Sequence, residues 1–153
     1  MKKLLLIGIM ATFLSGCAQE PQLLKQTASG KAESEYPNNT PEQVMDAIVQ
    51  RCNEHGFVIE DQSKNYVICS KQMEGAQSML TQIAIGNAYS TTPQVKVRYS
   101  VSKFKSGAKA WAESWAETQM AFGQIQRAPL NNNNVRNELQ SVLDKGIPEI
   151  LNR

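Results

Sequence analysis

The chain has 153 residues, the size of a single domain. Hydrophobic residues make up 41% of it, which is enough for a packed core, and charged residues make up only 20%. The formal net charge is +2 and no basic run is present, so the sequence offers no electrostatic footprint for nucleic acid and no polybasic patch for anionic lipid.

The N-terminus has the pattern of an export signal. Lys2 and Lys3 precede a run of eleven uncharged, mostly apolar residues at 4–14. A helix needs about 20 residues to span a bilayer, so this run is too short to cross but has the length of a signal-peptide core. It ends in Leu14-Ser15-Gly16-Cys17, which resembles the lipobox of bacterial lipoproteins.

This resemblance implies a cellular location for the mature protein. In bacterial lipoproteins a peptidase cuts before the cysteine, so residues 1–16 would be removed and Cys17 would carry lipid, anchoring the chain to a membrane. Ala18 stands where an Asp tends to retain such proteins in the inner membrane, which implies the outer membrane, with the domain facing the periplasm or the cell surface. The alternative is an ordinary secretory signal with a chance cysteine.

The segment that follows the cysteine is polar and irregular. Residues 18–40 are rich in Gln, Ser, Glu, Lys and Asn with little apolar periodicity. Such a composition buries little surface, so we expect residues 17–40 to form the lipidated cysteine and a flexible tether, followed by one domain at 41–153.

The first predicted helix covers residues 41 to about 54. Thr40 is a suitable N-cap, Pro41 suits the first helical position, and Gln43 completes a capping box. Apolar residues recur at helical spacing at Val44, Ile48 and Cys52. Gly56 is placed to end the helix.

The middle of the chain predicts mainly strands. Residues 57–61 and 66–70 read as a hairpin around a polar turn at 62–65. Residues 74–90 are ambiguous, although Met79, Ile83 and Ile85 indicate a short helix. Residues 94–104 alternate apolar and polar side chains. The segment 108–120 has an alanine content that favours helix and a position after a turn that favours strand; we expect a strand.

Residues 123–130 are expected to form an extended connection. The Asn run at 131–134 then caps a last helix that Gly146 and Pro148 stop. The predicted fold class is α+β: a small antiparallel sheet of about four strands with two or three helices packed on one face.

Two cysteines remain beyond Cys17. Cys52 lies near the end of the first helix and Cys69 in the second predicted strand, so the two meet if the helix packs on that hairpin. An oxidising compartment would favour a disulfide, and two buried thiols are the alternative. The sequence has no CxxC, a single histidine (His55), and no phosphate loop, nucleophile elbow or zinc-protease motif. We therefore expect no catalytic residue, no metal site and no cofactor.

A candidate contact surface follows from the strand register. If Ser106-Gly107 is the hairpin loop, Arg98 faces Trp115 and Lys96 faces Glu117 across the two long strands. Trp111, Trp115, Phe104 and Arg98 then lie on the sheet face away from the helices. A loop of three or five residues, or a helix at 108–120, would instead send both tryptophans into the core.

The resulting functional expectation is a non-enzymatic outer-membrane lipoprotein that binds an envelope protein partner. One alternative is a periplasmic lipoprotein that binds a small ligand or glycan between the sheet and the helices. Another is a phage- or plasmid-borne exclusion lipoprotein that acts on a surface receptor. A deep pocket would favour a ligand, and a flat apolar patch would favour a protein partner.

Overall fold

The computed structural model describes residues 20–87 and 89–153. Cys17 and the expected signal segment 1–16 lie outside the described residues. The elements follow one another as β1 (Ala32–Tyr36), α1 (Pro41–Glu54), β2 (Val58–Gln62), β3 (Tyr66–Gln72), α2 (Gly75–Ile85), β4 (Gln94–Phe104), β5 (Gly107–Gln119), a 3₁₀ turn (Ala121–Gly123), β6 (Ile125–Pro129), α3 (Asn133–Ser141), a π-helical segment (Val142–Gly146) and α4 (Ile147–Leu151).

The strands form one antiparallel sheet. Its order is β1-β5-β4-β3-β2, and β6 pairs with the far end of β5. The α+β class with an antiparallel sheet is confirmed, but the sheet has six strands rather than about four. The two strands missed as sheet members, β1 and β6, both pair with β5, and each is only five residues long.

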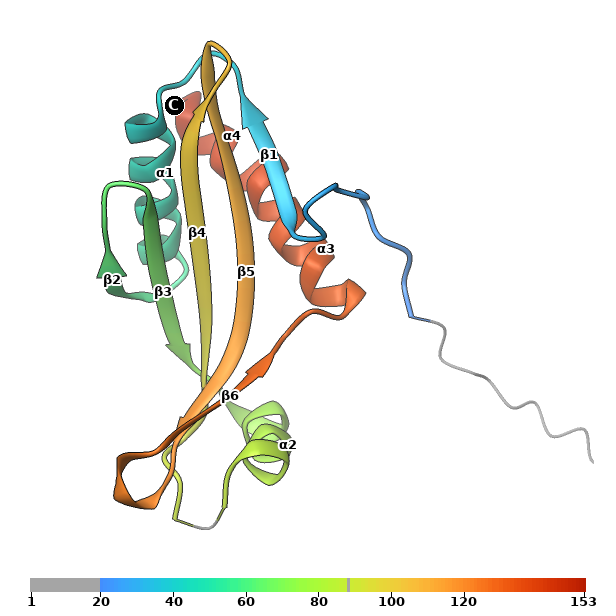
Figure 1. Ribbon diagram of the computed structural model, residues 1–153, viewed down its shortest axis with the longest axis vertical. Coiled ribbons are helices and arrows are strands. Elements are labelled where there is room, and N and C mark those ends of the chain that lie inside the picture. The colour runs from blue at the N-terminus through green and yellow to red at the C-terminus, as the bar shows by residue number, and fades with distance from the viewer. Residues whose placement is uncertain (1–19, 88) are drawn as a thin grey trace, which may run out of the picture.

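The core lies between the sheet and the helices α1, α3 and α4, which share one side of it (Figure 1). We call the side without these helices the outer face. The largest fully buried side chains of the core are Ile48, Leu143, Ile147, Val44 and Val67. The short helix α2 lies near the far end of the sheet, next to β6 (Figure 1).

Helix α1 begins as its sequence predicts. The Thr40 side chain accepts a hydrogen bond from the Gln43 backbone N–H at 3.3 Å, and the Gln43 side chain accepts one from the Thr40 N–H at 2.9 Å. This capping box satisfies donors that a helix start otherwise leaves unpaired. Gly56 follows the C-cap with φ 71°, the left-handed conformation that ends helices.

The flexible tether expected at residues 17–40 is wrong for residues 32–36, which form strand β1. Residues 32–36 pair with β5 and bury Ala32 and Tyr36, whose hydroxyl donates to the Leu143 carbonyl at 2.7 Å. The residues before them also contact the domain, since the Gln22 carbonyl accepts a hydrogen bond from Asn137 at 2.8 Å. The strand was missed because its inward residues alternate with Glu33 and Glu35, which make the segment look uniformly polar.

The second segment of the long hairpin, after β4, is a strand, β5, as predicted, but the predicted residues of the loop were wrong. The loop is Lys105-Ser106, and Phe104 pairs with Gly107, so Arg98 lies opposite Glu113 and not Trp115. Gly107 is needed for a tertiary reason, because a Cβ there would overlap the carbonyl oxygen of Tyr36. Since both loops contain two residues, the predicted faces of the two strands are unchanged.

The C-terminal helix does not stop at Gly146 and Pro148. Asn132 caps α3 by accepting from the Val135 N–H at 3.0 Å, and the helix then continues through the π-helical segment into α4. Gly146 is buried against α1: a Cβ there would lie 3.0 Å from Arg51 Nε. Its role is to admit the Arg51 side chain, and Pro148 is the second residue of α4, directly after the π-helical segment.

Candidate functional site

The four residues predicted as a contact surface all lie on the outer face. Trp111, Trp115, Phe104 and Arg98 are half-buried, whereas the residues that alternate with them point into the core. The strand geometry therefore confirms their position on the helix-free side. The residues directly opposite them across the strands differ from those predicted, because the register is shifted.

Arg98 stacks on an aromatic ring of the neighbouring strand. Its guanidinium carbon lies 4.4 Å from the centre of the Tyr66 ring. The Tyr66 hydroxyl donates to Asp61 at 2.8 Å, and this hydrogen bond raises the pKa of Tyr66. Tyr66 was not among the predicted site residues. It lies opposite Ser100 of β4, which in turn lies opposite Trp111 of β5. This position follows only from the pairing of β3 with β4, which the sequence does not specify.

Lys109 joins the two aromatic residues near the hairpin end. Its Nζ lies 5.3 Å from the Phe104 ring centre and 5.5 Å from that of Trp111, within the range of cation–π attraction. The same Nζ donates to Glu33 of β1 at 2.8 Å. This hydrogen bond is the largest cause of the lowered pKa of Glu33.

Trp115 belongs to a network of charges at the other end of the face. Its indole N–H donates to Glu117 Oε2 at 3.1 Å, and Arg127 Nε donates to the same oxygen at 2.6 Å. The other carboxylate oxygen accepts from Lys96 at 2.5 Å, and Lys96 also donates to Glu60 at 2.6 Å. Burial opposes ionisation of Glu117, but the hydrogen bonds from Lys96, Trp115 and Arg127 outweigh it and lower its pKa.

These contacts make the outer face an ordered surface of aromatic rings with cations beside them. The side chains that form it come from β1, β2, β3, β4, β5 and β6. Chemically, the surface offers partly exposed aromatic rings and fixed charges of both signs. Such a surface is suited to binding, because its side chains are already held by one another and lose little freedom on contact.

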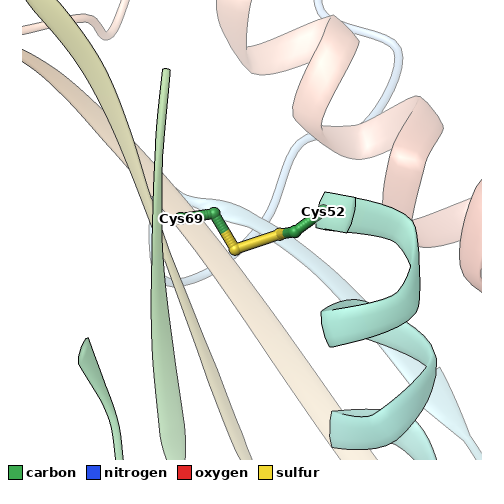
Figure 2. Close-up of a disulfide and its surroundings, with 2 residues drawn as sticks. All are labelled: Cys52 and Cys69. Atoms are coloured by element: carbon green, nitrogen blue, oxygen red, sulfur yellow. A yellow bond between two sulfur atoms is a disulfide. The ribbon is translucent and has the colours of Figure 1, made fainter. Parts of the chain in front are cut away.

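The helix side of the sheet contains an open cleft of about 790 Å³. Its floor is the inner side of β4 and β5, including Val97, Tyr99 and Ser114, and its walls come from the end of α1 and from α3. The predicted disulfide between Cys52 and Cys69 is present and lines this cleft. Figure 2 shows it linking the end of α1 to β3.

The remaining features considered from the sequence are the single histidine, a metal site and a membrane-spanning helix. His55 is exposed at the C-cap of α1, on the rim of the cleft. Within residues 20–87 and 89–153, no cluster of three or more His, Cys, Asp and Glu side chains is arranged to hold a metal ion. In the same part of the chain, no helix has the length and apolar character needed to cross a membrane.

Comparison with protein families, with curated proteins and with solved structures found no match to this chain.

Proposed function

We propose that this protein is a non-enzymatic lipoprotein of the cell envelope that binds a protein partner through its outer face. The observation that carries the proposal is the placement of Trp111, Trp115, Phe104 and Arg98 on one helix-free face, each with part of its surface open to solvent. Tyr66 joins them through its contact with Arg98.

The composition of the face supports a protein partner. Tryptophan, tyrosine and arginine are the residues most enriched among those that dominate binding energy at protein interfaces. Arg98 and Tyr66 form one such pair, and Trp111 and Trp115 lie four positions apart on the same side of β5. A partner that covers this surface would contact aromatic rings along its length and the charges beside them.

The order of the face supports tight recognition. Lys109 is held by Glu33, and Glu117 by Lys96 and Arg127, so the charged side chains beside the rings are fixed before a partner arrives. Immobilising a long side chain on binding costs about 0.5–1.5 kcal/mol, and a preordered surface avoids part of this cost.

The cellular setting of the proposal rests on the lipobox. Lipid on Cys17 would hold the protein at the outer membrane and bring the outer face within reach of envelope proteins. A disulfide between Cys52 and Cys69 is compatible with an oxidising compartment.

Site-specific photo-crosslinking in cells tests the proposal. A photo-reactive residue at Ser102, exposed on the outer face, should give a defined protein adduct, and the same residue at Asp46, exposed on α1, should not. A Cys17→Ser variant should lose the adduct if anchoring brings the partners together. Equal adducts from Ser102 and Asp46 would contradict the proposal.

A further inference from the structure

The cleft on the helix side is a second site, separate from the outer face. It opens where the end of α1 and the start of α3 leave part of the inner side of the sheet uncovered. Its floor includes Val95, Val97 and Tyr99, and its α3 wall includes Val135 and Leu139. Its volume of about 790 Å³ lies in the range of sites for small organic ligands, about 300–1,000 Å³.

The floor of the cleft is uncharged. Tyr99 is 6% exposed, and burial raises its pKa to about 12, so its phenol stays neutral at ordinary pH. The remaining floor side chains are mostly aliphatic. A ligand that covers this floor would gain free energy mainly by removing apolar surface from water.

Arg51 is the distinctive group of this cleft. Its Nε is buried without a hydrogen-bond partner, and no acidic side chain of residues 20–87 and 89–153 forms an ion pair with it. A buried donor without an acceptor costs about 1–3 kcal/mol, more when it is charged. Arg51 also lines the cleft, so an anion bound there would place an opposite charge beside its guanidinium.

The π-helical segment that packs against Arg51 has a glycine at the point of contact. The guanidinium packs on Gly146, where a Cβ would lie 3.0 Å from Nε and 3.2 Å from Cζ. Gly146 ends the π-helical segment that begins at Val142, which itself lines the cleft. Single π-helical turns often occur at functional sites. The chain therefore combines a cation whose Nε has no hydrogen-bond partner, a glycine that admits it and an irregular helical turn at one end of an apolar floor.

We infer that this cleft binds a single-chain anionic amphiphile, with its alkyl chain on the apolar floor and its carboxylate or phosphate on Arg51. The other charged side chains of the lining favour neither an anionic nor a cationic ligand, since Lys71, Glu74 and Glu138 are exposed and of mixed sign. Exposed charges at the rim are screened by water and salt, whereas the part-buried Arg51 is screened less.

The test uses the chain from Ala18 onward, which contains every described contact, and defined probes below their micelle concentrations. Laurate, dodecyl phosphate and dodecyltrimethylammonium each carry a twelve-carbon chain, counting the carboxyl carbon of laurate, with different head groups. Calorimetry should show both anions binding at least tenfold more tightly than the cation, a difference of 1.4 kcal/mol. The stronger of the two anions identifies the head group. In NMR spectra, the methyl signals of Val97, Val135 and Leu139 should shift.

Variants separate the charge of Arg51 from its role in packing. Arg51→Gln should weaken anion binding at least tenfold and leave binding of the cation unchanged, and Arg51→Lys should restore part of the preference. Lys103→Gln, which removes an exposed cation outside the cleft, is the matched control. If Arg51→Gln does not fold, Val135→Trp tests the same cleft by filling it and should abolish binding.

Several outcomes would overturn the inference. One is equal binding of laurate and dodecyltrimethylammonium, and another is no binding of either anion. A third is binding that Val135→Trp leaves intact. Shifts of the cleft methyl signals with protein concentration alone would assign the cleft to a second copy of this chain instead.

Discussion

Lys96 and Glu117 form an ion pair on the outer face although they are not direct partners across the strands. The register places Lys96 opposite Trp115, yet 2.5 Å separates Lys96 Nζ from Glu117 Oε1. The two side chains are only 8% and 10% exposed. A pair this protected from water is expensive to break, because removing one partner leaves the other charge buried.

Glu117→Gln should therefore destabilise the protein strongly. The substitution removes the charge that Lys96 and Arg127 share, and we expect a loss of about 3 kcal/mol in the free energy of unfolding. Urea denaturation measures it. Glu113→Gln is the matched control, because Glu113 lies on the same strand and face but pairs with Lys31 in solvent, 40% and 45% exposed. The control should lose less than about 1 kcal/mol in the free energy of unfolding. Equal losses in the two variants would contradict the claim that burial makes the Glu117 pair the more costly one to break.

The Glu117 carboxylate should also make the free energy of unfolding depend on pH in the acid range. The pKa of Glu117 is lowered in the folded state from its ordinary value of 4.5. A lowered pKa means that the stabilisation is fully present above 4.5 and is lost as the pH falls through the folded-state value. Unfolding measured between pH 6 and about 2 should show a steep decline below pH 4.5 that is shallower in Glu117→Gln. Identical slopes in the two proteins would count against this assignment.

Loss of the Cys52–Cys69 disulfide should weaken the fold without rearranging it. The bridge closes a loop with a sequence separation of 17. For such a loop the entropic stabilisation is about 3 kcal/mol, so the double variant Cys52→Ala/Cys69→Ala should lose about that much. Reductant should destabilise the parent protein similarly and leave the double variant unaffected. A parent protein that is insensitive to reductant would contradict the role of the bridge.

Gly107→Ala should destabilise the molecule even though the residue lies beside an exposed loop. A Cβ would overlap the Tyr36 carbonyl oxygen and the backbone of Pro37, neither of which is a flexible side chain. We expect a loss of about 2 kcal/mol, in the range of overpacking substitutions, measured by chemical denaturation. Ser106→Ala, at the exposed neighbouring position, should change little. A loss no greater than that of Ser106→Ala would show that the connection after β1 moves freely.

The elements that the sequence predicted well are those set by local signals. The capping box of α1 needs only Thr40 and Gln43, and β5 was predicted from its position after the turn signal Ser106-Gly107, against an alanine content that favours helix. The outer-face position of Trp111 and Trp115 was expected only for a two-residue loop, since a longer loop or a helix would have placed both in the core.

The features that were missed depend on residues far apart in the sequence. Strand β1 forms because β5, more than 70 residues away, has an edge to pair with, and nothing in residues 32–36 indicates that edge. Gly107 and Gly146 looked like turn and stop signals, whereas each makes room for another segment, the backbone after Tyr36 and the side chain of Arg51. The charge network of Lys96, Glu117 and Arg127 brings together three strands, one of which was predicted only as an extended connection.

The proposed partner surface is tested most directly by replacing its two tryptophans. We measure the photo-crosslinked adduct from Ser102 together with the melting temperature in Trp111→Ala and Trp115→Ala. Because both rings are half-buried on the outer face, we predict a tenfold or greater loss of adduct with a fall in melting temperature of only a few degrees. An undiminished adduct, or unfolding of both variants at physiological temperature, would contradict the account and assign these tryptophans to stability instead.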